Sequence, residues 1–366
     1  MNSIGCNKAT KRQPLFSKVL HVIVFVYTVF FSCYVLLLFL NFSGGINGYV
    51  PANFPSMVYG YGYSPYVSRA LLPFFIRFIT LITPYSLHQV FLHSFVTLHL
   101  SALMDWHQNW ETAFISEYLI GCLLIFSCLI GFLVAICGLY RVVCTYSSNI
   151  YLYLPILALS GILLHFSYQN YLYDFSTLFL STIGYLFLYR ADWKRYLCIF
   201  ILAVINKETA ILFLLLFSLY YWKSPLLSRK EFIKLSILQI IFFVGIRTTI
   251  YFLFQKNLGT PLEFHFYDHT LPIVEHLFIL HWNTVIFLLI FLLIIYRWKA
   301  KSKFVRLGLW TLVPLVICSL FFGYVDEWRD YYEVYPFILI LTVDGGTMFF
   351  LDAKTNYLLL KKRILS

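Results

Sequence analysis

The chain has 366 residues, of which 61% are hydrophobic, 20% aromatic and 12% charged, and its mean hydropathy is +0.79. A soluble core could not hide so much apolar surface, and continuous rather than alternating apolar runs exclude an outer-membrane barrel. The net charge of +11 lies mostly at the ends of apolar runs, where basic residues fix topology and contact headgroups. We therefore expect one all-α, polytopic membrane domain over residues 1–366, with membrane lipids and not nucleic acid as partners.

Residues 1–18 form a basic tail before a long apolar run, which we expect to be the first span, Val19–Leu40. No small-residue cleavage site follows, so this run reads as a retained signal anchor. Residues 41–117 are predicted to form a long first outer loop that opens with a stretch rich in Gly, Pro and Tyr. Two interrupted apolar runs in this loop, Phe74–Ile82 and Ser86–Met104, are typical of helices lying in the outer interface.

Histidines and cysteines give no metal-binding pattern. The loop histidines lack the i, i+4 pair of a helical zinc site, and only His88 and His99 are expected to share a helical face. The eight cysteines fall in predicted helices or cytoplasmic segments, with no paired Cys-x-x-Cys spacing and no disulfide framework. The sequence therefore predicts no metal and no other cofactor.

Residues 118–366 are predicted to form the transmembrane core. Together with the first span, seven further apolar runs give eight full crossings. Every junction assigned to the cytoplasm is basic, so both termini are expected to be cytoplasmic. The seven runs are Tyr118–Tyr140, Ile150–Phe166, Phe175–Leu188, Leu235–Phe254, Leu277–Tyr296, Leu307–Val325 and Pro336–Leu351.

The polar segment Ile205–Ala210 lies between two apolar runs, Tyr196–Val204 and Ile211–Tyr220, each too short to cross a bilayer. Basic clusters flank the pair on both sides, so both ends are expected on the cytoplasmic face. These features predict a re-entrant pair of short helices with Asn206, Lys207 and Glu208 at its tip. Charged residues at membrane depth are costly unless they pair or line a wet cavity. Lys207 and Glu208 either neutralise each other or serve a ligand.

Other charged residues occur near the predicted outer face. Arg247 lies within a predicted span and needs an anionic partner, for which Glu208, Asp344 and a ligand phosphate are the candidates. Asp174 is placed to cap the fourth span. Arg329 and Glu333 are four residues apart and either pair along a helix or leave the arginine to face a phosphate.

Four segments are similar in kind and order to blocks in poorly characterised bacterial multi-pass membrane proteins. The overall plan resembles the C-type glycosyltransferase (GT-C) fold of enzymes that use polyprenyl-phosphate sugars, with an N-terminal span, a long first outer loop with interface helices, and many later spans. The four segments are Ser68–Pro73, Tyr173–Phe175, Asn206–Ala210 and Glu327–Pro336.

This resemblance implies a membrane glycosyltransferase that moves a sugar from a polyprenyl-phosphate donor to a glycan or lipid acceptor on the outer face of a bacterial inner membrane. In that fold an acid of the first outer loop is the general base, which points to Asp105 and then Glu111. The sequence departs from the family pattern because no Asp or Glu lies between Val19 and Met104. The expected substrate-binding residues are Arg69, Asp174, Asn206, Lys207, Glu208, Arg247, Glu327, Arg329 and Glu333.

The chemistry of the residues fits this implication. Sugar transfer from a lipid phosphate needs cations for the leaving phosphate, a carboxylate for the acceptor proton and aromatic faces for the sugar rings. Tyr59, Tyr61, Tyr63, Trp106 and Trp110 are the aromatic candidates. The alternatives are a lipid-linked sugar transporter or flippase, which would use intramembrane charges as a path, and a polysaccharide polymerase with outer-face arginines.

Overall fold

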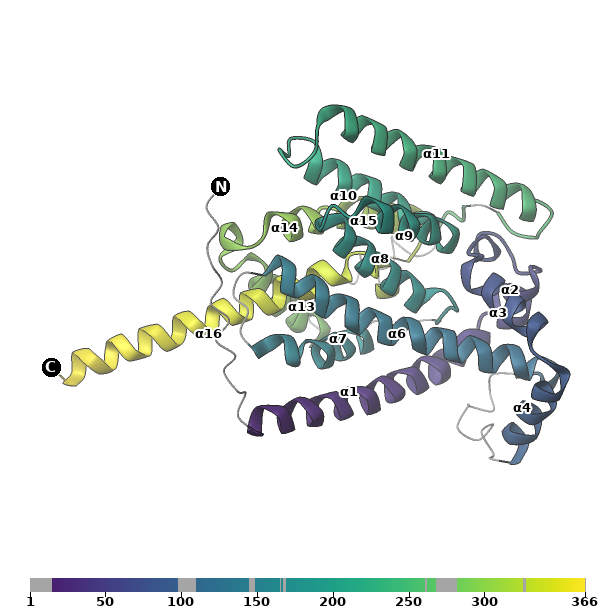
Figure 1. Ribbon diagram of the computed structural model, residues 1–366, viewed down its shortest axis with the longest axis horizontal. Coiled ribbons are helices and arrows are strands. Elements are labelled where there is room, and N and C mark those ends of the chain that lie inside the picture. Colours follow the sequence, from purple (N-terminus) through teal and green to yellow (C-terminus); the bar gives the residue numbers. More distant parts are fainter. Residues whose placement is uncertain are drawn as a thin grey trace.

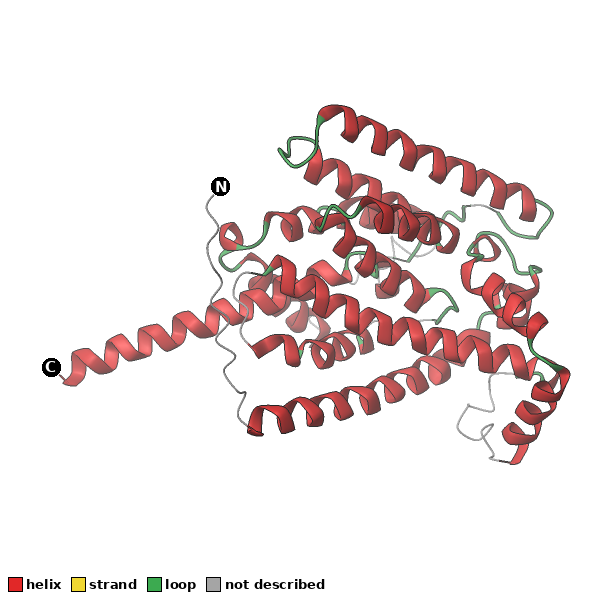
Figure 2. Ribbon diagram, in the orientation of Figure 1, coloured by secondary structure: helices red, strands yellow, loops and turns green. Residues whose placement is uncertain are grey.

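The computed structural model describes residues 15–97, 110–144, 149–164, 166, 169–260, 262–267, 282–324 and 327–365. Within these ranges every regular element is a helix, and strand-like pairing is limited to one isolated bridge between Ser64 and Gly259 (Figures 1 and 2). The all-α prediction is confirmed for this part of the chain.

Five helices among the described residues are long and apolar enough to cross a membrane. They include α1 (Leu15–Asn41), α6 (Ile115–Val143), α11 (Arg229–Phe254) and α16 (Tyr335–Leu365), and the fifth combines α14 (Lys303–Leu309) with α15 (Leu312–Phe322). Each coincides with a predicted apolar run. The membrane character expected from the composition therefore agrees with helix lengths.

Three other predicted spans are shorter helices: α7 (Leu154–Leu163), α8 (Asp174–Tyr189) and α13 (Trp282–Ile295). All three fall below the roughly 20 residues of a full crossing, so helix length alone does not give eight spans. Most of α8 is buried between α6 and α9, where its packing partners are protein side chains. The residues of the Leu277–Tyr296 prediction before Trp282 lie outside the described ranges.

The centre of the molecule is formed by α6, α8 and α9 (Trp193–Asn206), which pack along one another. Gly184 of α8 allows α10 (Ile211–Tyr221) to approach closely, because a Cβ at this position would overlap the ring of Phe213. The peripheral helices are α1 and α11, which lie along opposite edges in Figure 1 and expose many apolar side chains. Such exposed apolar helices are expected of a protein surrounded by lipid.

The predicted short helical pair forms an antiparallel hairpin. Trp193 at the start of α9 lies 5.1 Å, ring to ring, from Tyr221 at the end of α10, and the rings of Tyr196 and Phe217 stack at 6.5 Å. The two helices are joined by Lys207 and the 3-10 turn η7 (Glu208–Ala210). The polar segment therefore forms the tip of a helical hairpin.

The first outer loop contains the 3-10 turns η1 (Phe42–Asn47), η2 (Val50–Ala52) and η3 (Tyr66–Ser68), and the helices α2 (Phe54–Tyr59), α3 (Leu71–Ile82) and α4 (Tyr85–Thr97). Both predicted interface runs are thus helical as far as Thr97, and residues 98–109 lie outside the described part. The Asn257 amide donates to the carbonyls of Gly60 and Gly62 at 2.8 and 2.9 Å. These bonds fasten the loop to the chain just after α11.

Candidate functional site

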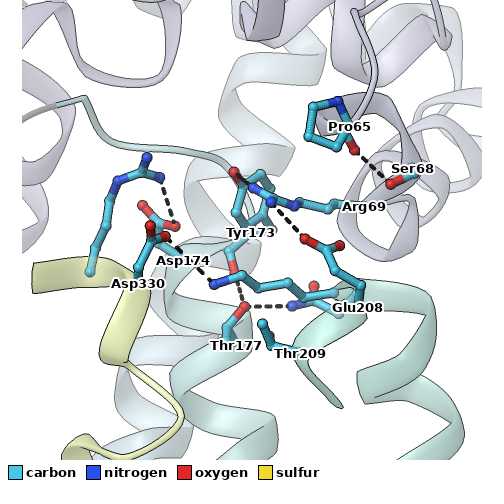
Figure 3. Close-up of polar contacts among 12 residues, drawn as sticks. Pro65, Ser68, Arg69, Tyr173, Asp174, Thr177, Glu208, Thr209 and Asp330 are labelled. Atoms are coloured by element: carbon cyan, nitrogen blue, oxygen red, sulfur yellow. Dashed lines mark hydrogen bonds and ion pairs between the residues drawn. The ribbon is translucent and has the colours of Figure 1, made fainter. Parts of the chain in front are cut away.

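A cavity of about 520 Å³ opens where the segment predicted as the first outer loop meets the hairpin tip, the C-terminal ends of α11 and α15, and the 3-10 turn η10 (Trp328–Tyr331). Charged residues from five separate parts of the chain line it. In Figure 3, Arg69 and Glu208 lie on one side and Asp174 and Asp330 on the other. The charged residues that line the cavity are Arg69, Lys207, Glu208, Arg247, Glu263, Glu327, Arg329 and Asp330.

Asn206 creates the break between the two hairpin helices. Its buried side chain accepts a hydrogen bond from the Ser176 hydroxyl at 2.6 Å and donates one to the Thr177 hydroxyl at 2.8 Å. Lys207, the next residue, is extended, with φ −156° and ψ 145°. Successive side chains along an extended backbone point in opposite directions. Lys207 and Glu208 therefore reach different groups.

Glu208 joins two arginines from distant segments. Its Oε1 lies 2.8 Å from Nη2 of Arg69 in the first outer loop, and its Oε2 lies 3.5 Å from Nη2 of Arg247 in α11. Arg247 also donates to the carbonyl and the hydroxyl of Ser68, at 3.2 and 3.0 Å. Of the two side chains proposed as partners for Arg247, Glu208 is the one it contacts. This group of two cations and one anion carries one net positive charge.

Lys207 pairs with acids near the last helix. Its Nζ lies 3.3 Å from Oε1 of Glu333 and 3.9 Å from Oδ1 of Asp330, and the side chains of Lys207 and Glu333 are only 8% and 3% exposed. The Thr209 hydroxyl also donates to Glu333. Lys207 and Glu208 therefore do not neutralise each other, because each takes partners on its own side of the hairpin tip.

Arg329 is held by two carboxylates and a tyrosine ring. Its Nε and Nη2 donate to Oε1 of Glu327 at 2.8 and 2.5 Å, and its Nη1 lies 3.6 Å from Oδ1 of Asp174. Its guanidinium lies 3.8 Å from the centre of the Tyr171 ring. The possible Arg329–Glu333 pair along a helix is not formed, because Glu333 pairs with Lys207. Arg329, Lys207 and their four acids together carry two net negative charges.

Tyrosines that the sequence did not single out connect the two arginine groups. The Tyr171 ring stacks on Tyr173 at 5.4 Å and on Tyr66 at 5.3 Å. The Arg69 guanidinium lies 4.4 Å from the Tyr173 ring centre and donates to its hydroxyl. Cation–π contacts of this kind add to the ion pairs that orient a guanidinium. The only sequence signal was the position of Tyr173 beside Asp174.

Four of the five aromatic residues predicted for the outer loop lie in the described part of the chain, and these four do not line the cavity. The Tyr59 hydroxyl donates to Glu117 at 2.6 Å, and the Trp110 ring packs against Tyr118 at 4.1 Å. Trp106 lies outside the described residues. Tyr61 and Tyr63 are exposed and are not among the residues that line the cavity. The aromatic residues that line the cavity are instead Tyr49, Tyr66, Tyr171, Tyr251, Phe254, Phe322 and Tyr324.

The two predicted general bases are not among the acids placed at the cavity. Asp105 lies outside the described residues, and Glu111 is exposed just before α6 and does not line the cavity. Asp330 does line it, with its side chain 26% exposed and one ion pair at 3.9 Å. The sequence indicated the segment around Asp330 but favoured its neighbours, because no spacing distinguishes an acid facing a cavity from one facing a helix.

The ionisation of Glu208 gives a testable pH dependence. Burial opposes ionisation of its carboxyl, but Arg69 and Arg247 outweigh burial and lower the pKa from 4.5 to about 2. The ionised form therefore stabilises the fold above pH 4.5, and this contribution is lost as the pH falls toward 2. We expect the difference in thermal unfolding midpoint between wild type and Glu208→Gln to shrink over this range. A constant difference would contradict the ion-pair account.

Comparison with protein-family models, with curated proteins and with solved structures finds no match for this chain. The protein is therefore characterised by its own fold and its own candidate site. The described part of the chain is helical, with five helices long and apolar enough to cross a membrane, and a charged cavity lies at the tip of a helical hairpin.

Proposed function

We propose that this protein is a membrane glycosyltransferase that moves a sugar from a polyprenyl-phosphate donor to a glycan or lipid acceptor. One observation carries the proposal: arginines, carboxylates and apolar side chains all line a single cavity. A ligand with an anionic group, a polar sugar and an apolar tail matches this combination.

The donor phosphate is assigned to Arg69 and Arg247. Their shared carboxylate, Glu208, is 38% exposed and faces the cavity, so an entering phosphate can take over its arginine contacts. The planar fork of arginine suits phosphate oxygens. When the bond between the sugar anomeric carbon and the phosphate oxygen breaks, the leaving lipid phosphate gains one negative charge. The net positive group at Glu208 favours that charge.

The acceptor is assigned to the opposite, acid-rich side. Its hydroxyl oxygen forms the new bond to the anomeric carbon and passes its proton to a carboxylate. Asp330 suits this role because it faces the cavity, whereas Asp174 and Glu333 are buried and Glu327 already accepts two hydrogen bonds from Arg329. Nζ of Lys207 lies 3.9 Å from Oδ1 of Asp330 and would help to orient this carboxylate.

The membrane arrangement is part of the proposal. The bundle would cross a bacterial inner membrane eight times, with both termini in the cytoplasm and the first outer loop on the far side. The hairpin of α9 and α10 would enter from the cytoplasm and turn back. With 14 residues, α9 would reach about 21 Å into a core about 30 Å thick. Its charged tip would then meet the outer loop.

Transfer from a synthetic polyprenyl-phosphate sugar by the purified protein in lipid nanodiscs tests the proposal. Arg69→Ala and Arg247→Ala each remove charge-assisted hydrogen bonds worth about 1.5–3 kcal/mol, so we expect kcat/KM to fall about 10- to 100-fold. Arg69→Lys should not restore the full rate, because a point charge cannot make the two-pronged contact.

Two outcomes would contradict the assignment. Equal rates in the wild type and both alanine variants would show that the two arginines do not bind the donor. Movement of the lipid-linked sugar across the bilayer of proteoliposomes, with no sugar transferred to any acceptor, would instead identify a flippase.

A further inference from the structure

A second, much smaller cavity lies beside the hairpin tip, where α8 and α9 meet the residues just before α16. Its volume is about 10 Å³. Lys207 and Thr209 line both this cavity and the large one, so the hairpin tip lies between the two. The polar side chains that line the small cavity are Thr177, Ser181, Asn206, Lys207, Thr209 and Glu333.

The Glu333 carboxylate has one oxygen with partners and one without. Its Oε1 accepts from the Thr209 hydroxyl and lies 3.3 Å from Nζ of Lys207. Its Oε2 is buried, and no described protein group donates to it. Buried polar atoms in proteins are, with few exceptions, bonded to protein or to ordered water. The cavity that Glu333 lines is the space from which a donor can reach Oε2.

Two neighbours of this space have hydrogen-bonding capacity left. The Lys207 ammonium has three N–H groups, and its two carboxylate partners are Glu333 at 3.3 Å and Asp330 at 3.9 Å. The Ser181 hydroxyl donates to the Leu178 carbonyl at 3.0 Å, which leaves its oxygen free to accept. One small molecule could therefore accept from Lys207 and donate to both Glu333 and Ser181.

We propose that the small cavity binds one ordered water molecule, which bridges Lys207, Glu333 and Ser181. A water needs about 10–15 Å³ of such space and typically makes about three hydrogen bonds when buried. A metal cation would lie against the Lys207 ammonium, and an anion would lie against the Glu333 carboxylate, so charge favours a neutral molecule. The water joins α8, the hairpin tip and the segment before α16, and its site does not depend on sugar transfer.

An electron cryo-microscopy map of the purified protein in nanodiscs, at a resolution that shows ordered water, tests the site. We expect one peak within about 2.5–3.2 Å of Oε2 of Glu333. Ser181→Val should displace it, because the two methyl groups fill the cavity and cannot accept a hydrogen bond. Thr182→Val is the matched control, since Thr182 is buried on the same helix but does not line the cavity, and it should keep the peak.

Three results of the map would overturn the proposal. The first is a wild-type map without the peak, and this measurement stands even if Ser181→Val does not fold. The second is a peak that persists in Ser181→Val. The third is a peak held by several oxygens at about 2.0–2.5 Å, which would identify a metal cation in place of water.

A second measurement uses two buried phenylalanines of the wild type. Phe213 lines the small cavity and Phe337 does not, although both side chains are buried. Hydroxyl radicals produced by an X-ray pulse in isotopically labelled water modify side chains beside bound water. Phe213 should therefore acquire labelled oxygen while Phe337 stays unmodified. Equal protection of the two rings would contradict a water beside Phe213.

Discussion

Replacing Lys207 by methionine should destabilise the protein by about 3–5 kcal/mol, because it leaves the carboxylate of Glu333 buried and without its cation. The Glu333 side chain is 3% exposed, and its second oxygen has no hydrogen-bond partner among the described groups. Reversible unfolding in mixed detergent micelles would measure the loss. Lys223→Met is the control, since Lys223 is exposed after α10 and its replacement should change stability by less than about 0.5 kcal/mol.

The double variant Lys207→Met with Glu333→Met distinguishes a stabilising role of Lys207 from a role in catalysis. An ion pair replaced by apolar side chains is often neutral for stability, so most of the loss should be recovered, apart from about 1 kcal/mol for the Thr209 hydrogen bond. If Lys207 also orients Asp330 for catalysis through their 3.9 Å ion pair, the double variant should remain inactive although it is folded. A stable and fully active double variant would mean that Lys207 serves the fold alone.

The length of a helix and the groups that surround it explain which membrane spans could be predicted from the sequence. The runs that became α1, α6 and α11 are long and continuous, so their sequence pattern and length carried the information. The run that became α8 has only 16 residues and is enclosed by other helices. Nothing local distinguishes a short helix enclosed by protein from a short crossing of a bilayer.

The hairpin was predictable because the polar residues that separate its two helices are consecutive in the sequence. Asn206 ends α9, and the polar tip follows at once between two short apolar runs. The partners of the tip were not predictable. Glu333 lies more than a hundred residues after Lys207, and Arg69 lies as far before Glu208. Adjacent opposite charges suggested an internal pair, but the extended backbone at Lys207 sends the two side chains apart.

The same limit explains the choice of acid for the acceptor proton. The sequence favoured Asp105 and Glu111 from the family plan, which places a base in the first outer loop. In the structure, Arg69 of that loop lines the same cavity as the acids of η10 and of the residues around it. Which carboxylate faces the shared space depends on long-range packing, and Asp330 differs from its acidic neighbours only in that exposure.

Replacing Asp330 by asparagine should lower the rate of sugar transfer by about 10²–10⁴, the usual cost of removing a general base. The exchange keeps the side-chain shape, and the ion pair it weakens is long, 3.9 Å from Lys207. Donor affinity should therefore stay close to the wild-type value, and the loss should appear in kcat. Asp105→Asn and Glu111→Gln are the matched comparisons, each removing one negative charge from the first outer loop. If either of these variants loses the rate while Asp330→Asn keeps it, the base belongs to the loop, as the family resemblance implies. If all three keep full activity, the acceptor is activated by another carboxylate of the cavity, and Glu263 becomes the next to replace.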